Sequence, residues 1–215
     1  KDCIILITGA GDGIGRAVSI ACARHGATVI LLGRTTTKLE AVFDEIIDSG
    51  FPEPGIVPMD LATAGLEEIS ALAEVIDSRY GLLDGLLHNA SILGERVPFD
   101  HYGIDQWQQV MQVNLNAVFL LTRILLPLLQ RSDDSRLLFT SSGVGTTPRA
   151  YWGAYSVSKY ATEGLAKLLA DELANTSSVR VNIINPGATR TAMRAEAYPA
   201  EDPTTLKTPE DLLPL

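Results

Sequence analysis

Short apolar runs rich in β-branched residues alternate with longer stretches of helical period, and this alternation limits the possible folds more than any other feature of the chain. Six runs are predicted to be strands: 4–7, 28–32, 55–59, 85–88, 136–140 and 179–184. They lack the polar–apolar alternation of half-exposed strands, which predicts burial on both faces. Five stretches have a helical pattern: 13–25, 36–49, 65–80, 105–131 and 153–175. Repeated strand–helix–strand units with short connections predict an α/β fold, a doubly wound parallel sheet in a three-layer αβα arrangement.

The length and composition indicate one globular domain. No linker, repeat or low-complexity segment interrupts the 215 residues, so 1–215 is predicted to be a single domain with a substrate loop at about 190–207. The net charge of −9, from 17 basic and 26 acidic residues, argues against a surface that binds DNA or RNA.

No segment has the features of a membrane or export sequence. The apolar stretches are interrupted before the ~18 residues that a membrane span needs, and none resembles a signal peptide. We therefore expect a cytoplasmic protein that contacts neither nucleic acid nor membrane. Its two cysteines, Cys3 and Cys22, lie in apolar patterns and are predicted to be buried and reduced.

A glycine-rich loop directly follows the first predicted strand and opens the first predicted helix. Glycine there allows a tight turn and a close approach of the backbone to a pyrophosphate, while the helix N-terminus supplies N–H donors. Such a loop alone is weak evidence, because glycine also ends strands, but its position between strand and helix strengthens it. The sequence therefore predicts a Rossmann-type domain that binds a dinucleotide cofactor. The residues assigned to this loop are Gly9, Gly11, Asp12, Gly13, Ile14 and Gly15.

The end of the second predicted strand indicates which nicotinamide cofactor is bound. A domain that binds NAD places Asp or Glu about 20 residues after the loop, where it meets the ribose 2′-hydroxyl. Gly33 occupies this place here, and Arg34 and three threonines follow it. Arg34, helped by Lys38, can bind a 2′-phosphate through charge-assisted hydrogen bonds worth about 1.5–3 kcal/mol. The sequence predicts NADP(H), and the alternative role for Arg34 is an ordinary exposed cation.

Tyr155 and Lys159 lie in the first turns of the predicted helix at 153–175 and carry the signal for catalysis. Their i, i+4 spacing places both side chains on one helix face, one turn apart. Phenol has a pKa of about 10, which makes it a poor acid–base catalyst at neutral pH. An ammonium ~4 Å away would lower that pKa by roughly three units at an effective dielectric constant of about 20. A routine pair on a helix surface is the alternative, because this spacing is common by chance.

Ser142 makes the catalytic interpretation stronger. It lies thirteen residues before Tyr155, at the end of the fifth predicted strand. The carboxyl ends of the strands in such a sheet face one crevice. A serine hydroxyl there can donate a hydrogen bond to the reacting oxygen of a substrate.

In their order along nearly the whole chain, these motifs resemble the short-chain dehydrogenase/reductase family, in its single-domain branch. The Gly-x-x-x-Gly-x-Gly spacing of the loop is typical of that family, and the stretches at 83–90, 152–155 and 185–195 are similar to bacterial YciK-type reductases. The resemblance implies that Tyr155 donates the proton, that Ser142 rather than Ser141 polarises the reacting oxygen, and that Lys159 binds the nicotinamide ribose. It further implies that Asn114 kinks its helix and supports a proton relay; the alternative for Asn114 is a simple buried hydrogen-bonding residue.

The same resemblance implies cofactor contacts after the third and fourth strands. Asp60 would meet the adenine amino group, although an Asp in this position is more often a helix N-cap. Leu61 would pack on the adenine ring. Asn89 matches the family's Asn-Asn-Ala-Gly motif, whereas His88 and Ser91 depart from it and are expected to be tolerated.

After the sixth strand, the stretch at 186–191 matches the family's Pro-Gly-x-x-x-Thr motif. By this resemblance Pro186, Gly187 and Thr191 would close over the nicotinamide carboxamide and the diphosphate. Trp152 either lines the substrate pocket or packs locally. The family pattern continues after residue 211 into one more helix and a last strand, which this sequence does not contain.

Taken together, these features predict an NADP(H)-dependent oxidoreductase that transfers a hydride between nicotinamide and a small carbonyl or alcohol substrate. The alternative is a catalytically silent NADP-binding regulatory protein. No metal site is expected, because the three histidines lack ligand spacing. The loop at 192–207 does not identify the substrate.

One predicted helix is apolar almost all the way round. Residues 114–130 contain a single charged residue, Arg123, so the sheet alone would leave part of the apolar surface exposed. We expect a homodimer or homotetramer that forms through the helices at 105–131 and 153–175. Burial by loops of the same chain is the alternative.

Overall fold

The computed structural model describes residues 3–213, and in it the predicted strands form one parallel sheet. The strands are β1 (Ile4–Thr8), β2 (Thr28–Gly33), β3 (Gly55–Pro58), β4 (Gly85–His88), β5 (Arg136–Thr140) and β6 (Arg180–Ile184). Their order is β3-β2-β1-β4-β5-β6, and all neighbouring pairs are parallel. The direction of winding therefore reverses between β1 and β4, as the predicted doubly wound fold requires.

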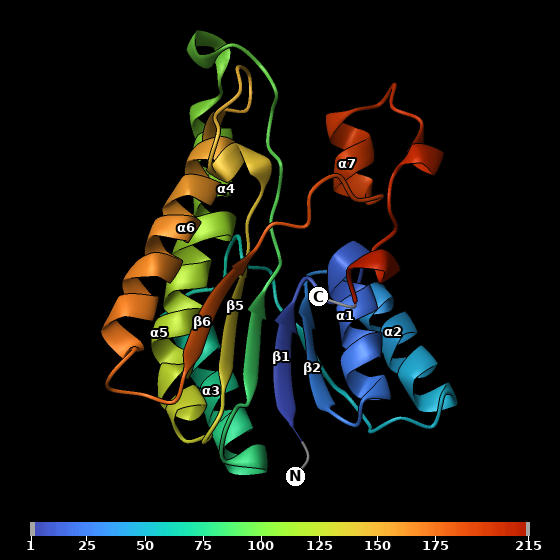
Figure 1. Ribbon diagram of the computed structural model, residues 1–215, viewed down its shortest axis with the longest axis vertical. Coiled ribbons are helices and arrows are strands. Elements are labelled where there is room, and N and C mark those ends of the chain that lie inside the picture. Colours follow the sequence, from blue (N-terminus) through green and yellow to red (C-terminus); the bar gives the residue numbers. More distant parts are fainter. Residues whose placement is uncertain (1–2, 214–215) are drawn as a thin grey trace.

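Helices cover both faces of this sheet (Figure 1). On one face lie α1 (Gly13–Arg24) and α2 (Thr36–Asp48). The other face carries α3 (Leu66–Tyr80), α4 (Ile104–Met111), α5 (Ala117–Gln130) and α6 (Gly153–Leu173). The three-layer prediction is confirmed.

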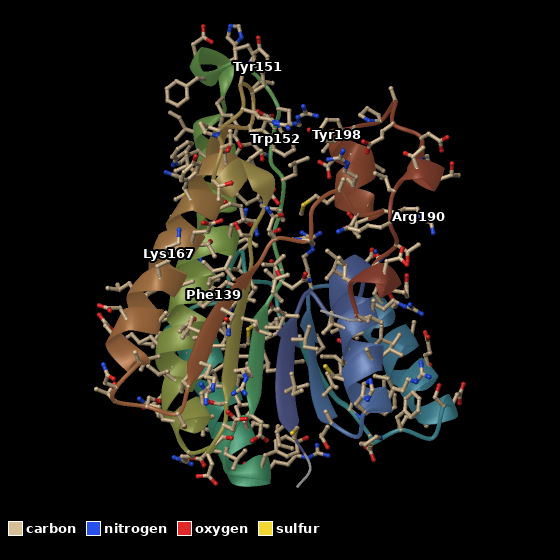
Figure 2. The ribbon with its side chains drawn as sticks, viewed as in Figure 1. Phe139, Tyr151, Trp152, Lys167, Arg190 and Tyr198 are labelled. Atoms are coloured by element: carbon tan, nitrogen blue, oxygen red, sulfur yellow. The ribbon has the colours of Figure 1, made fainter. Side chains whose placement is uncertain are left out.

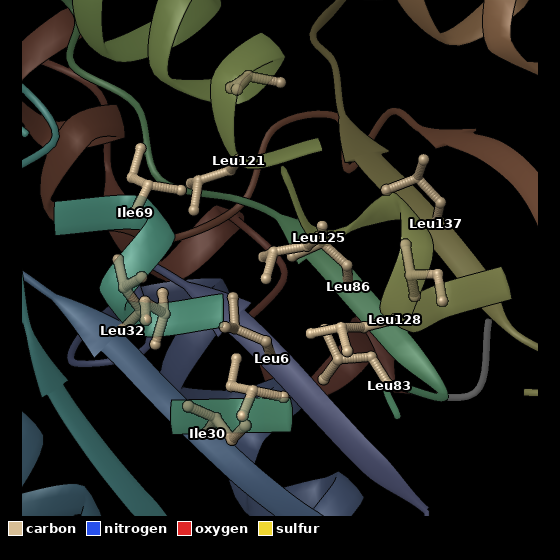
Figure 3. Close-up of a cluster of buried hydrophobic side chains, with 14 of the residues drawn as sticks. Leu6, Ile30, Leu32, Ile69, Leu83, Leu86, Leu121, Leu125, Leu128 and Leu137 are labelled. Atoms are coloured by element: carbon tan, nitrogen blue, oxygen red, sulfur yellow. The ribbon is translucent and has the colours of Figure 1, made fainter. Parts of the chain in front are cut away.

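The central residues of the inner strands are apolar because alternate residues enter two different cores. Leu6 packs with the α3 and α5 side chains Ile69, Leu121 and Leu125 (Figure 3). Its neighbour Ile7 points to the opposite face, into the cluster under α1 and α2. Both residues are fully buried, which is the two-sided burial expected of a central parallel strand.

The outer strands depart from that prediction. Along β6, Arg180 and Asn182 are exposed, and in β3 no residue is fully buried. These two strands are the edges of the sheet within the described residues, so each has a neighbouring strand on one side. Their sequence pattern predicts a strand correctly but not its place in the sheet.

The helix predicted at 105–131 is interrupted by a wider turn. A π-helical turn at Gln112–Asn116 separates α4 from α5. Asn114 lies in it and is buried, with its side chain bonded to the backbone of Ile92 in the loop after β4. π-Turns of this kind are frequent at functional sites.

Among residues 3–213, the segment Ile104–Gln130 is long enough to cross a membrane and contains an 18-residue window with a mean hydropathy of 1.5. The expectation that no apolar stretch reaches that length is therefore wrong. Half of this window is buried inside the fold. Leu121, Leu125 and Leu129 are fully buried against the sheet, so the apolar character belongs largely to a core helix.

The chain after β6 contains a short helix that the sequence pattern did not predict, α7 (Ala192–Ala197). Single 3-10 turns occur at Phe99–His101, Gly143–Gly145, Pro203–Thr205 and Glu210–Leu212. From α7 the chain returns to the side of α1 (Figure 1). The burial predicted for both cysteines is wrong: Cys3 is exposed just before β1, Cys22 is half-buried, and both are free thiols.

Candidate active site

A cleft of about 990 Å³ opens at the carboxyl ends of the strands. Segments that follow all six strands line it, so side chains far apart in the sequence face a common space. The cleft includes the point between β1 and β4 where the winding reverses, which is where doubly wound sheets bind ligands.

The glycine-rich loop after β1 has a backbone that only glycine can adopt. Gly9 and Gly13 have φ angles of 69° and 49°, in the left-handed region. A Cβ atom on Gly15 would lie 2.1 Å from the carbonyl oxygen of Gly9. Gly9, Gly11, Gly13 and the backbone of Asp12 and Ile14 border the cleft, whereas Gly15 lies behind the loop and permits its close packing.

This loop leads directly into the N-terminus of α1. The Asp12 side chain accepts a hydrogen bond from the Gly13 N–H at 2.7 Å and so caps the helix. The same carboxylate forms an ion pair with Lys38. A tight glycine backbone at a helix N-terminus, bordering a cleft, fits a pyrophosphate.

Arg34 follows β2 and borders the cleft with an exposed guanidinium. No ion pair or hydrogen bond joins it to another residue within the described part of the chain. Its charge is therefore available to a ligand phosphate. Lys38, expected to assist it, is instead paired with Asp12.

The segments after β3 and β4 also line the cleft. Asp60 accepts a hydrogen bond from the Ala62 N–H at 2.9 Å, so one of its oxygens already caps the local turn. Leu61 is buried and borders the cleft. The Asn89 amide donates to the Thr8 carbonyl at 3.3 Å, which ties β4 to the start of the glycine-rich loop.

Thr8 is a positioning residue that the sequence reasoning missed. Its hydroxyl accepts hydrogen bonds from the backbone N–H groups of Asn89 and Ala90, each at 3.0 Å, and it is almost fully buried. A buried polar residue at the end of an apolar strand, directly before the loop, was the available signal. This hydroxyl aligns the two strand ends between which the winding reverses.

Tyr155 and Lys159 point into the cleft from the first turns of α6. Both are buried, with 7% and 4% of their surface exposed. The Lys159 ammonium lies 5.6 Å from the centre of the Tyr155 ring and donates a hydrogen bond to the Thr140 carbonyl at 2.8 Å. The predicted shared helix face is confirmed, although the amine is anchored to the end of β5 rather than to the phenol oxygen.

The lowered pKa expected for Tyr155 is not what the chain by itself shows. Burial raises the pKa of the phenol, while the hydroxyls of Ser142 and Ser91 act in the opposite direction. Burial likewise lowers the pKa of Lys159 to about 8. The lowered pKa predicted for Tyr155 took account of the attraction between ammonium and phenolate but not of the loss of water around both groups.

The choice between the two neighbouring serines is clear from their surroundings. Ser142 borders the cleft beside Tyr155. Ser141 also borders it, but its hydroxyl donates a hydrogen bond to the buried carboxylate of Glu163 at 2.7 Å. Its proton is therefore engaged within the fold, whereas the hydroxyl of Ser142 acts to lower the pKa of the phenol.

Ser91, expected only to be tolerated, is a second residue that the sequence reasoning missed. It borders the cleft after β4, and its hydroxyl lowers the pKa of Tyr155. Its position at a strand end, in the same crevice as Ser142, was the available signal. The phenol thus has a serine hydroxyl from each of two strand ends as a neighbour.

Asn114 lies close to this group but not in it. Its amide bonds the backbone N–H and carbonyl of Ile92, at 2.9 and 3.0 Å, and the Ser158 hydroxyl at 3.1 Å. No hydrogen bond joins it to Lys159 within residues 3–213. These contacts are those of a buried residue that fastens the loop after β4 to α6.

The segment after β6 closes the cleft. Pro186, Gly187 and Thr191 all border it, and Gly187 has a φ of 65°. Thr191 caps α7 by accepting a hydrogen bond from the Arg194 N–H at 3.2 Å. A Cβ atom on Gly13 would lie 3.2 Å from the Thr191 methyl group, so this segment touches the glycine-rich loop.

The sequence as a whole matches a known family. A family model described as short chain dehydrogenase matches residues 3–202. The chain belongs to the short-chain dehydrogenase/reductase family. It is 53% identical over 215 residues to the uncharacterized oxidoreductase YciK of Escherichia coli (strain K12). The matched residues are all of this chain and 84% of that relative. The predicted resemblance to YciK-type reductases is confirmed.

Two further family members add a fold match and a named activity. A short-chain dehydrogenase of Shigella flexneri 2a str. 301, crystallised with NADP, superposes with a TM-score of 0.96 at 52% identity, over all of this chain and 89% of that one. The cyclohexanol dehydrogenase of Acinetobacter sp. (strain SE19) is 32% identical over 199 residues, which are 92% of this chain and 77% of that relative.

The burial of Lys159 predicts a specific dependence of stability on pH. Because its pKa falls from 10.5 to about 8 on folding, the unfolded chain binds more protons than the folded chain between these values. The free energy of unfolding should therefore rise as the pH increases through this range. Lys159→Met should remove that increase, measured by urea unfolding at several pH values.

The matched control is Lys167→Met, since Lys167 lies on the same helix and is 69% exposed. This variant should keep the pH slope of the unaltered chain. Equal slopes for the unaltered chain and Lys159→Met would contradict the assignment of a lowered pKa to Lys159.

Proposed function

We propose that the protein is an NADP(H)-dependent oxidoreductase that interconverts a carbonyl group and an alcohol, with Tyr155 as general acid and base. The observation that carries the proposal is that Ser142 and the buried side chains of Tyr155 and Lys159 line the cleft that the glycine-rich loop borders. The cyclohexanol dehydrogenase activity named for one relative supports the alcohol–carbonyl chemistry.

In the reductive direction, the Tyr155 hydroxyl donates its proton to the carbonyl oxygen of the substrate. The Ser142 hydroxyl donates a hydrogen bond to the same oxygen and so stabilises the charge that develops there. Lys159 keeps a positive charge beside the phenol ring at neutral pH and favours the phenolate that remains. Asn114 supports the proton relay indirectly, because it fixes the loop after β4 against α6.

The residues that would hold NADP(H) are those that border the cleft. The loop from Gly9 to Ile14 would bind the pyrophosphate, and Arg34 the 2′-phosphate. When bound, the cofactor supplies or accepts the hydride at its nicotinamide ring. Further contacts are assigned to Asp60, Leu61, Asn89, Lys159, Pro186, Gly187 and Thr191.

The support for NADP(H) comes from Arg34 and from the NADP complex of the Shigella flexneri relative. The free cysteines are consistent with our placement of the enzyme in the reducing cytoplasm. Its partners would be small molecules rather than nucleic acid or lipid.

Tyr155→Phe should reduce turnover by about 10²–10⁴-fold and leave NADPH affinity unchanged, because only the proton donor is lost. NADPH oxidation with a panel of carbonyl compounds measures turnover, and fluorescence titration measures affinity. Tyr80→Phe is the control, since Tyr80 lies at the end of α3 and does not border the cleft. Near-normal turnover of Tyr155→Phe would contradict the assignment. An unaltered protein that binds NADPH but reduces no member of the panel would favour the silent regulator.

Arg34→Gln should lower the preference for NADPH over NADH by about 10- to 100-fold, because one charge-assisted contact to the 2′-phosphate is lost. The ratio of kcat/KM values for the two cofactors measures this preference. Arg24→Gln, which removes an exposed cation at the end of α1, should leave the ratio unchanged. An equal preference in the unaltered chain and Arg34→Gln would refute this role.

We further propose that α5 and α6 form a homodimer or homotetramer interface. Apolar side chains on these two helices remain open to solvent: Phe119, Val157, Tyr160 and Leu168 are 41–55% exposed. Exposed apolar side chains on two helices are expected where a second subunit covers them. All four residues lie in the segments 105–131 and 153–175, where the interface is expected.

Phe119→Glu should dissociate the oligomer, because it would place an unpaired charge inside the contact. Sedimentation velocity measures the assembly state. Val75→Glu is the control, because Val75 is 60% exposed but lies on α3, which is not one of the two helices of the proposed interface. A monomeric unaltered chain, or an assembly that survives Phe119→Glu, would overturn this interface.

A further inference from the structure

A small apolar cluster forms the wall of the cleft around Tyr155. It contains Leu93, Val144, Trp152 and Tyr155, and Tyr198 packs against it. The Trp152 ring lies between two other aromatic rings, 5.8 Å from that of Tyr155 and 5.9 Å from that of Tyr198. Figure 2 shows Trp152 and Tyr198 close together, at the end of the molecule that holds α7. The substrate side of the cleft is therefore aromatic.

Arg96, in the segment after β4, lies over this aromatic wall. Its guanidinium is 4.7 Å from the centre of the Trp152 ring and 5.0 Å from that of Tyr198. Stacking on two rings restrains the guanidinium plane but uses none of its N–H donors. The Trp152 ring thus contacts both this cation and the ring of the proposed proton donor.

The donors of Arg96 are not used by the fold. Within residues 3–213, no ion pair and no hydrogen bond joins its guanidinium to another residue. Arg194, on the same Tyr198 ring, shows the contrasting case. Both of its guanidinium bonds go to Glu201, at 2.6 Å each, so its charge is already neutralised.

Four carboxylates border the cleft, those of Asp12, Asp60, Glu95 and Glu196, and none of them is paired with Arg96. Glu95 lies beside Tyr102 and Gly103, where its Oε2 would be 3.8 Å from a Cβ atom on Gly103. Glu196 is exposed on α7. Arg96 is thus a restrained cation on the wall of the substrate pocket, with its donors open to a ligand.

We propose that Arg96 binds an anionic group of the substrate, and that the substrate is a carbonyl or hydroxy compound with an apolar body and a carboxylate or phosphate. The apolar body would pack against Trp152 and Leu93. The anion would accept two parallel hydrogen bonds from the guanidinium edge, the geometry in which arginine binds carboxylates and phosphates. This inference deepens the proposed function, since it places the anion one ring away from Tyr155.

The first test measures binding without turnover. Titration calorimetry on the protein saturated with NADP⁺ compares benzoate and phenyl phosphate with benzamide, a neutral compound of similar shape to benzoate. We expect an anion to bind more tightly than benzamide, and Arg96→Gln to weaken it by about 10- to 100-fold. Whichever of benzoate and phenyl phosphate binds more tightly shows whether a carboxylate or a phosphate is preferred.

Arg79→Gln is the matched control, because Arg79 also stacks on an aromatic ring, 5.3 Å from the centre of Tyr80, but lies at the end of α3. It should leave anion binding unchanged. Benzamide binding as tightly as both anions, or unchanged anion affinity in Arg96→Gln, would overturn the proposal.

The second test separates this inference from the proposed function. NADPH oxidation is measured with benzoylformate and with its neutral methyl ester. We expect a higher kcat/KM for the acid, and in Arg96→Gln a raised KM for the acid with little change for the ester. Equal kcat/KM values for acid and ester would support the oxidoreductase but overturn the anion site. Anion binding that depends on Arg96, with no reduction of any ketone, would support the site while the proposed reaction fails.

Discussion

The attachment of α6 to the end of β5 is the interaction on which the candidate site depends. Lys159 is buried, and its ammonium is held by the Thr140 carbonyl at the last residue of that strand. Burying an ammonium in a protein is costly unless it is hydrogen-bonded. This bond therefore restricts where the first turns of α6 can lie, and with them the position of Tyr155.

Three further buried contacts hold the same helix. Ser156 donates to the Val144 carbonyl at 2.6 Å, and Ser141 donates to Glu163 at 2.7 Å. On the opposite side, the Asn114 amide donates to Ser158 at 3.1 Å. The phenol is thus positioned by strand, turn and neighbouring helix together. Such redundancy suits the role proposed for Tyr155, in which its hydroxyl meets a substrate oxygen within hydrogen-bond distance.

The sheet brings the two halves of the site together. Thr8 links the end of β1 to β4, and the glycine-rich loop begins at the next residue. Gly15 allows α1 to approach this loop so closely that any side chain would collide with Gly9. The proposed pyrophosphate site and the proposed proton donor consequently border one cleft, although about 140 residues of sequence separate them.

The sequence by itself determined the order of the elements, because apolar period and strand-ending glycines are local properties. It also predicted candidate residues for the chemistry, Ser142 at the end of the fifth strand and Tyr155 in the helix that follows. Only the tertiary structure decided that β3 and β6 are the outer strands within residues 3–213, which residue pairs with Lys38, and how the pKa effects at Tyr155 balance. The role of Ser91 and the stacked position of Arg96 also emerged only there. Each of these depends on which distant segment lies beside a residue and how much water it excludes, and neither quantity is encoded by spacing along the chain.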